Sequence, residues 1–325
     1  EMSASLVGSE MCIRDSDTSV ELQAGSRVAV VSKSTSGEFW GLVKKGMEQA
    51  IADVNEAYGF KKEDQVTMTF EGASDEKDVE SQVNTIDAVI AENPDVLCVS
   101  ASDMDSLQAQ LEAAKENGIP VVAFDSGVTD SKMVRAFRGT DNTRVGEIAA
   151  YRLATAIGKM GKVAVFSAQE KTQSIQERVS GFTNYITNYP DIEVVEIVYQ
   201  DQVDDMTAAM QEVLDKYPQL DGVFCDNADI ADLYLDMKKD ETKDSIVMVG
   251  VDATAKQQEA IWNSKEVGVV SQQPYAMGYQ TIWTALLTTA PKKSVEIKRN
   301  VRIDPAWIDS SNIDDPTYSS YLYAN

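Results

Sequence analysis

The sequence predicts an α/β fold with two domains, each built on a doubly wound parallel sheet. From Arg27 onward, short β-branched runs alternate with longer amphipathic runs, which is typical of repeated strand–helix–strand units. Six of the short runs are almost continuously apolar, as expected for parallel strands that helices cover on both faces. The chain has 325 residues, which is enough for two domains of about 150 residues each.

The first half of the alternation predicts four strands and three helices. The expected helix over 39–58 carries Val43, Met47 and Ala50 at helical spacing, which gives it a core-facing stripe. Pro94 ends the second helix. In order, we expect strands over 27–32, 65–70, 96–100 and 121–124, and helices over 39–58, 78–94 and 105–118.

The alternation restarts after the segment 133–142 (MVRAFRGTDN). We expect helices over 143–158, 172–189, 204–217, 229–239, 256–263 and 277–287. We expect strands over 162–167, 193–199, 222–225, 246–252, 267–272 and 294–301. The remaining tail, 303–325, has little periodicity, and we expect it to lie over the surface.

The composition favours a binding function over catalysis. With 29 basic and 53 acidic side chains the net charge is −24, which repels nucleic-acid backbones and anionic lipid surfaces. The chain has no histidine, so Ser–His–Asp catalysis, Cys–His catalysis and histidine-ligated metals are excluded. We therefore expect no cofactor, no metal site and no nucleic-acid or membrane partner.

The cysteines and the first residues say little about function. Three cysteines form neither a disulfide framework nor a zinc pattern. Cys98 and Cys225 lie in apolar strands and are expected to be core thiols, with a disulfide between them left open. Residues 1–16, including Cys12, resemble a translated sequencing adapter and lack the features of a secretory signal. We expect 1–24 to be a non-native or disordered leader, without the native signal peptide.

Four polar side chains follow strands, at the edge where doubly wound sheets bind ligands. Asp125 follows VVAF, Asn227 follows GVFCD, Asp252 follows VMVGV and Gln272 follows VGVVS. Carboxylates and amides meet hydroxyl groups as acceptors and donors, so the pattern suits a small, hydroxyl-rich molecule. Asp125, Asp252 and Asn227 have the alternative of an Asx turn or a helix cap.

Two aromatic residues and a lysine follow the first strand. Phe39 and Trp40 either cover the C–H face of a sugar ring or anchor the helix start in the core. Because two adjacent aromatic side chains are not expected to share one core stripe, we expect at least one of them at the ligand. Lys33 either reaches the ligand or, as the safer interpretation, stays solvated.

Three further candidates lie at helix starts. Asn142 is suited to capping at least as well as to binding. Gln176 and Arg178 begin the helix after the fifth strand, and Arg178 either bonds the ligand or buttresses the site. Asp226 and Asp229 are weaker candidates.

From Arg27 to about Val301 the chain resembles the periplasmic sugar-binding proteins of the type I, ribose/galactose/xylose class, which feed ABC importers. The resemblance rests on an ordered set of motifs: VAVVS…EFW, IPVVAFDSGV, GTDNTRVGEIAA, IQERVSGF, DGVFCDNADIA, VMVGVDAT and VVSQQPYAMG. It implies two Rossmann-like lobes joined by three hinge crossings, with one sugar in the cleft on which they close. The implied function is extracytoplasmic capture of a neutral monosaccharide or polyol and its delivery to ABC permease subunits, by a protein that we expect to be a monomer.

The resemblance also implies residue roles and domain limits. The family's ring-stacking aromatics fall on Phe39 and Trp40, its hydroxyl-binding acids on Asp125 and Asp252, its second-domain amide on Asn227 and its hinge amide on Gln272. The crossings fall near Gly139–Asp141, Gln272–Pro274 and Arg302–Pro305. The expected lobes are therefore 25–139 with 273–302, and 140–272 with 303–325.

Two departures from the family pattern argue against ribose as the ligand. Ser126 stands where ribose binders carry an arginine, and Gln176 stands where they carry another. Loss of both guanidinium forks changes the hydroxyl pattern that can be read. Lys33 and the FDSG motif are similar to binders of the furanosyl signal autoinducer-2, but that group's second-domain acid and amide have no counterpart near Gln173–Ser174.

Two other classes of function stay open. A ligand-sensing domain of a signalling system or of a LacI-type regulator shares this architecture, although the residues before Arg27 show no basic helix-turn-helix. The second class is an enzyme that uses Asp125 and Asp252 as an acid–base pair, as in glycoside hydrolysis. The sequence has no G-x-S-x-G elbow, Walker loop or G-x-G-x-x-G motif to support catalysis.

Overall fold

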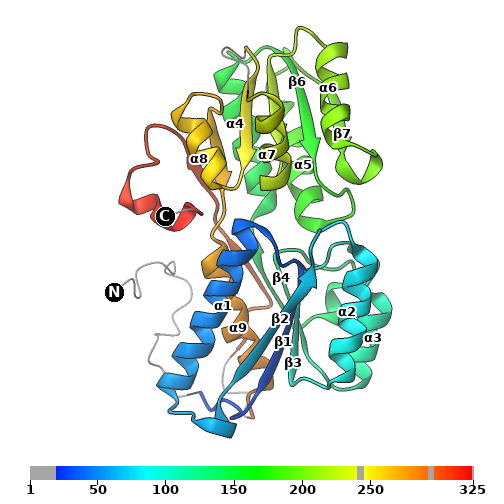
Figure 1. Cartoon of the computed structure of the whole chain (residues 1–325), viewed down its shortest axis with the longest axis vertical. Helices are drawn as coiled ribbons and strands as arrows, with labels where there is room; N and C mark the ends of the chain where they lie inside the picture. Colours follow the sequence, from blue (N-terminus) through cyan, green and yellow to red (C-terminus); the bar gives the residue numbers. More distant parts are fainter. Residues whose placement is uncertain (1–19, 240–244, 292–295, 324–325) are drawn as a thin grey trace. The chain divides into compact units, whose positions relative to one another are not determined.

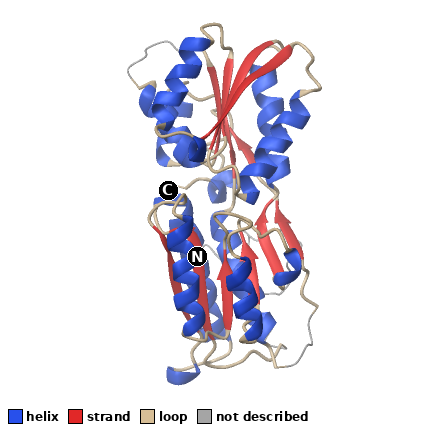
Figure 2. Cartoon of the chain, turned by 90° about the vertical axis from the view of Figure 1, so that its right-hand side faces the viewer, coloured by secondary structure: helices blue, strands red, loops and turns tan. Residues whose placement is uncertain are grey.

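The structure, a computed structural model, describes residues 20–239, 245–291 and 296–323 of the chain. The chain divides into two compact units. The first unit runs to Gly139 and includes Pro274–Ile303, and the second comprises Thr140–Gln273 and the residues from Asp304 onward. In the described part of the chain, each unit holds one six-stranded sheet with helices on both of its faces (Figure 1 and Figure 2). The predicted α/β fold class with two doubly wound sheets is confirmed.

The first unit is built on a mainly parallel sheet. Its strands are β1 (Arg27–Ser34), β2 (Thr67–Ala73), β3 (Val96–Val99), β4 (Val121–Phe124), β5 (Ala136–Thr140) and β11 (Asn300–Ile303). Its helices are α1 (Gly37–Ala57), α2 (Val79–Ala91), α3 (Gln108–Glu116) and α9 (Pro274–Thr289). The strand order is β11-β5-β4-β3-β1-β2, and the pairs from β5 to β2 are parallel.

Strand β1 shows why this sheet needs helices on both faces. Val28 and Val30 pack into an apolar cluster with α1 and α9, whereas Ala29 and Val31 pack into a second cluster with α2 and α3. Successive side chains of a strand point to opposite faces, so a strand that is apolar throughout has two faces to bury. Because both faces of the sheet are buried by helices, polar side chains can be placed at the carboxyl ends of the strands.

The second unit repeats the design. Its strands are β6 (Gly161–Ser167), β7 (Ile192–Tyr199), β8 (Gly222–Cys225), β9 (Val247–Val251), β10 (Gly268–Ser271) and β12 (Ala306–Ile308). Its helices are α4 (Asn142–Ala156), α5 (Gln173–Ile186), α6 (Met206–Lys216), α7 (Ala228–Met237) and α8 (Ala255–Trp262). The order is β12-β10-β9-β8-β6-β7, with every pair parallel except β10 with β12, which is antiparallel.

The two strand orders give equivalent positions. Strands β4 and β9 each hold the third place in their sheets, β3 and β8 the fourth, and β1 and β6 the fifth. Residues that follow equivalent strands can therefore be compared between the units, even though each unit is described by itself.

Three segments differ from the sequence-based expectation. Strand β5 lies in the segment 133–142, where no strand was expected. Strand β12 and a 3-10 helix, η4 (Pro316–Tyr321), lie in the tail, where little periodicity was found and no element was named. Of the strand expected over 294–301, residues 294 and 295 lie outside the described residues, and β11 begins only at Asn300. The periodicity of such short segments is too weak to reveal them.

The expected leader is only partly covered by the structure. Residues 1–19, with Cys12, lie outside the described residues. Val20 and Leu22, which the sequence analysis places in the leader, are instead buried in the apolar cluster of α1 and α9. Residues 20–24 therefore belong to the first unit.

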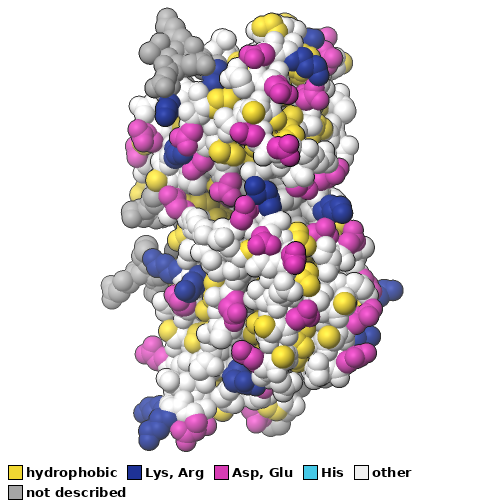
Figure 3. Space-filling model, turned by 45° about the vertical axis from the view of Figure 1, so that its right-hand side comes forward, with side chains coloured by type: hydrophobic (Ala, Val, Ile, Leu, Met, Phe, Trp, Pro, Cys, Tyr) yellow, Lys and Arg dark blue, Asp and Glu magenta, His cyan; other side chains and the backbone are white. Residues whose placement is uncertain are grey.

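The surface carries the acidic excess of the sequence. Figure 3 shows Asp and Glu side chains scattered over the visible face among fewer Lys and Arg side chains. Among the described helices, none combines the length and the apolar character that crossing a membrane requires.

Helices α1 and α9 pack closely at Gly46, and this close packing gives a prediction about stability. A Cβ atom on Gly46 would lie 2.0 Å from the backbone oxygen of Tyr275 in α9. We expect Gly46→Ala to lower the free energy of unfolding by about 1–3 kcal/mol, because the helices must separate. Gly41→Ala is the matched control, since a Cβ there meets nothing within 4 Å on the same helix.

The control is expected to stabilise the helix by up to about 1 kcal/mol, because alanine has the higher helix propensity. Urea unfolding of both variants measures the difference. Equal stability of the two variants would show that the helices do not rely on this close approach.

Candidate functional site

Asp125 lies at the carboxyl end of β4 with its carboxylate turned into the protein. It is 2% exposed, and its φ of 56° is in the left-handed region. Its Oδ2 accepts hydrogen bonds from Ser100 Oγ at 2.9 Å and Ser126 Oγ at 3.2 Å. Left-handed backbone is uncommon for residues other than glycine and often marks functional sites. The position is therefore more than a surface turn.

Lys33 is buried and paired, so the safer interpretation of a solvated lysine is wrong. Its Nζ lies 3.0 Å from Asp125 Oδ2 and 3.4 Å from Glu76 Oε2. The Lys33 side chain is 6% exposed, which means that the ammonium group has left bulk water for these two carboxylates. One positive charge thus lies between two negative ones at the end of β1.

The two aromatic residues of α1 lie next to this charge cluster. Trp40 donates its Nε1–H to Glu76 Oε1 at 2.6 Å, and its ring centroid lies 5.6 Å from Lys33 Nζ. Phe39 packs edge-on against Trp40, with ring centroids 5.0 Å apart. Trp40 is buried in the cluster of α1 and α9, and half-buried Phe39 packs against the same cluster. The premise that adjacent aromatics cannot share one core is therefore wrong, and stacking on a ligand stays a prediction.

Asp252 occupies the equivalent position at the end of β9 in the second unit. It is 3% exposed with a φ of 81°. Its Oδ1 accepts from Gln272 Nε2 and from the Tyr323 hydroxyl, both at 2.7 Å, and its Oδ2 accepts from the Ala228 backbone N–H at 2.9 Å. Thr254, not Asp252, caps α8. The alternative that Asp252 caps the next helix is therefore wrong.

The carboxylates of Asp125 and Asp252 share a design. Both follow the third strand of their sheets, both are buried, and both have left-handed backbone. A carboxylate offers about four acceptor positions, and each of these groups uses three for protein donors, counted over the described residues. At Asp125 all three donors reach Oδ2, which leaves Oδ1 for a hydroxyl group of a ligand, and at Asp252 one position remains on Oδ2.

Four predicted residues of the second unit, Asn142, Arg178, Asp252 and Gln272, are joined by one hydrogen-bond network. Arg178 donates from Nε to Asn142 Oδ1 at 2.8 Å, and Asn142 Nδ2 donates to Thr140 O at 3.3 Å. Thr140 Oγ1 donates to Gln272 Oε1 at 2.6 Å, and Gln272 in turn holds Asp252. Asn142, Arg178 and Gln272 are all buried. Arg178 and Asn142 thus buttress each other, and Asp141 provides the cap of α4 instead.

Asp226 is more central than the sequence analysis expected. It is buried at the end of β8 and accepts from the Ser167 hydroxyl and from the Ala168 backbone N–H. Its backbone oxygen accepts from Arg178 Nη1 at 2.7 Å. Burial raises the pKa of Asp226 to about 6, although the Ser167 hydrogen bond and the positive charge of Arg178 oppose the shift. The residue ties the end of β8 to Arg178.

Two predicted residues have more local roles. Asn227 caps α7, because its Oδ1 accepts from the Ile230 backbone N–H at 2.9 Å. Gln176 is half-buried in the first turns of α5, where its backbone N–H donates to Thr172 O. The described contacts do not join Gln176 to the Asp252 network, so a role of either side chain at a ligand stays a prediction.

Several residues of these networks, four of which reach a predicted site residue through their side chains at Lys33, Asp125, Gln272 or Asp252, were not named from the sequence. Glu76 pairs with Lys33, Ser100 with Asp125, Thr140 with Gln272, and Tyr323 with Asp252. Ser100 ends the third expected strand, so its place after a strand is a signal that could have found it. Tyr323 follows a long segment without periodicity, and no local pattern marks it.

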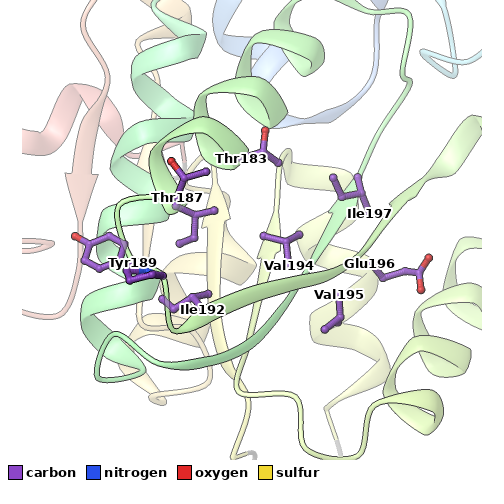
Figure 4. Close-up of a pocket in the computed structure, with 10 residues that line it drawn as sticks. Thr183, Thr187, Tyr189, Ile192, Val194, Val195, Glu196 and Ile197 are labelled. Atoms are coloured by element: carbon purple, nitrogen blue, oxygen red, sulfur yellow. The ribbon is translucent and has the colours of Figure 1, made fainter.

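A pocket detected in the second unit lies elsewhere. It is lined by the end of α5 and by β7, including Thr187, Ile192 and Val194 (Figure 4). Apolar side chains dominate this lining, and it includes none of the predicted site residues.

The two cysteines that the structure describes lie in the cores of the units. Cys98 and Cys225 are buried free thiols, so the disulfide that the sequence left open is absent between them. Burial raises the thiol pKa of both, which makes them poor nucleophiles. Over the described ranges, no group of three acidic or cysteine side chains could hold a metal ion.

Comparison with known proteins gives a family match over most of the chain. Residues 28–290 match the model described as "periplasmic binding protein domain". The ribose import binding protein of Bacillus subtilis (strain 168) is 27% identical over 203 residues, which are 62% of this chain and 66% of that protein. The chain thus matches just under two thirds of the length of this curated relative.

Two solved structures are similar over nearly their full length. An ABC transporter solute binding protein from Agrobacterium vitis with bound D-fucose is 28% identical, with a TM-score of 0.83. The matched region covers 92% of this chain and 100% of the Agrobacterium vitis chain. A second Agrobacterium vitis solute binding protein, bound with alpha-D-tagatopyranose, is 26% identical with a TM-score of 0.83, and the shares covered are again 92% and 100%.

Proposed function

This chain belongs to the periplasmic binding protein family, and we propose that it captures a neutral monosaccharide or polyol for an ABC importer. The observation that carries the proposal is the pair of buried, left-handed aspartates that follow equivalent strands, each with acceptor capacity left for a hydroxyl group. Carboxylates in this state accept from the hydroxyl groups of a sugar. The bound sugars of the two similar structures support the same class of ligand.

We assign roles to the predicted residues on this basis. Asp125 and Asp252 accept hydrogen bonds from hydroxyl groups, and Lys33 holds the Asp125 carboxylate in place. Phe39 and Trp40 supply apolar ring surface. The remaining polar residues orient the site or donate to the sugar: Asn142, Gln176, Arg178, Asn227 and Gln272.

The ligand is expected to be uncharged. Around Asp125, the single positive charge of Lys33 is already shared by two carboxylates, and the whole chain carries a charge of −24. An anionic ligand would be repelled by the local carboxylates and by the net negative charge of the whole chain. A neutral sugar meets none.

The location and partners follow from the family. We propose that the protein works outside the cytoplasm and delivers its sugar to permease subunits without chemical change. We predict that both units bind one sugar by hinge closure. We also predict that the protein is a monomer.

A thermal-shift screen tests the proposal. The protein is unfolded and refolded to remove any co-purified ligand, then mixed with D-ribose, D-fucose, D-tagatose, other pentoses and hexoses, polyols and autoinducer-2. A ligand at 100 times its dissociation constant adds about 2.7 kcal/mol, which raises the midpoint by several degrees. A shift with one sugar supports the proposal. Shifts with no compound would contradict it.

A further inference from the structure

The segment after β12 folds back onto the second unit. Ile308 and Ile313 are buried in a small apolar cluster with Ala253, Ile261 and Val269. Figure 1 shows this C-terminal segment, in red, beside α8. The segment is therefore packed against the end of β9 and against β10, the two strands that carry Asp252 and Gln272.

Hydrogen bonds fix the segment to the residues around the site. The Ser271 hydroxyl donates to Tyr321 O, and Gln273 Nε2 donates to the Tyr321 hydroxyl at 2.8 Å. The Tyr323 backbone N–H donates to Ala253 O at 3.1 Å. Contacts thus flank Gln272 on both sides and also reach the residue after Asp252.

The Tyr323 side chain contacts a proposed ligand-binding group directly. Its hydroxyl donates to Asp252 Oδ1 at 2.7 Å, and Tyr323 is 7% exposed. Burial raises the pKa of Tyr323 well above its usual value, and the Asp252 charge raises it further. The phenol therefore keeps its proton and remains a donor.

This donor determines which oxygen of Asp252 is available. Oδ1 receives two hydrogen bonds, from Tyr323 and Gln272, and each carboxylate oxygen has two lone pairs. Oδ2 receives one, from the Ala228 backbone, among the described residues. With Oδ1 saturated, Oδ2 keeps the remaining acceptor position.

We propose that Tyr323 is a positioning residue of the sugar site, which holds the Asp252 carboxylate so that Oδ2 faces the ligand. The inference rests on the proposed function, since it concerns the same carboxylate. Without the phenol, Oδ1 has a free lone pair and the carboxylate is fixed by fewer bonds. The C-terminal segment then influences the affinity of the site through Asp252.

Tyr323→Phe tests this inference, because it removes the hydroxyl and keeps the ring. The probe is the sugar that wild type binds most tightly among D-ribose, D-fucose and D-tagatose, measured by calorimetric titration. We expect the dissociation constant to rise about 5- to 20-fold, somewhat less than for direct loss of a charged hydrogen bond. Tyr318→Phe, on the same segment and half-buried, is the matched control and is expected to change it less than twofold.

A double-mutant cycle separates positioning from a structural role. If Tyr323 acts through Asp252, Tyr323→Phe has little further effect on the dissociation constant in an Asp252→Ala background. An equal effect in both backgrounds would overturn the inference, and so would a lower melting temperature with unchanged affinity. If Asp252→Ala weakens binding and Tyr323→Phe does not, this inference alone fails. If wild type binds none of the sugars and polyols of the thermal-shift panel at millimolar concentration, the proposed function fails with it.

Discussion

Exchange of Lys33 for methionine is expected to lower the free energy of unfolding by about 3–5 kcal/mol. The Lys33 ammonium lies 3.0 Å from Asp125 and 3.4 Å from Glu76, and all three groups are largely removed from water. Methionine has similar length but no charge, so two carboxylates would remain buried close together without their cation. Removal of one partner from a buried ion pair is costly for this reason. Chemical denaturation of the sugar-free protein measures the loss.

Two companion variants make the result interpretable. Lys44→Met removes an exposed lysine that pairs with Glu48 at 3.8 Å, and it is expected to cost about 0–1 kcal/mol. Lys33→Met combined with Asp125→Asn is expected to recover part of the loss, because one uncompensated charge is gone. If Lys33→Met is as stable as Lys44→Met, the charge cluster of Lys33, Glu76 and Asp125 does not stabilise the first unit.

Replacement of Asp252 by alanine is expected to weaken sugar binding by about 1.5–3 kcal/mol, the scale of a hydrogen bond to a charged group. The variant loses the acceptor at Oδ2 and also leaves Gln272 and Tyr323 without their common partner. Asp125→Ala is expected to have an effect of the same order. Calorimetric titration with the best sugar of the panel gives both values.

An exposed aspartate provides the control for this series. Asp215→Ala, on α6 and bonded to Gln211, is expected to leave the affinity unchanged. The melting temperature of each variant shows whether the fold is retained. If Asp125→Ala and Asp252→Ala both bind sugar as wild type does, the proposed site is wrong even where the family is right.

The sequence predicted the sheets well because apolar runs of parallel strands are a local signal. The runs before Asp125 and Asp252 are apolar throughout, since both faces of each strand are buried. Strand β5 escaped prediction because Arg138 and Gly139 interrupt its apolar character. Arg138 is buried there and donates to two backbone oxygens. Its placement depends on neighbours far away in the sequence.

The candidate site was predictable in position but not in its connections. A strand followed by an acid places Asp125 or Asp252 at the ligand edge, and this can be read locally. Whether Lys33 is solvated depends on Asp125 and Glu76, which come from other elements. Tyr323 lies 71 residues from Asp252 in the chain, so only the folded tail brings the two together. Contacts between side chains so far apart in the chain produce no periodic pattern in the sequence, so they cannot be predicted from it.

Calorimetric titration of refolded wild-type protein with pentoses, hexoses and polyols tests the central claim most directly. The account predicts saturable binding of at least one neutral sugar or polyol, with one molecule bound per chain. Binding to none of them at millimolar concentration, by protein that has refolded to a cooperative melting transition, would contradict it.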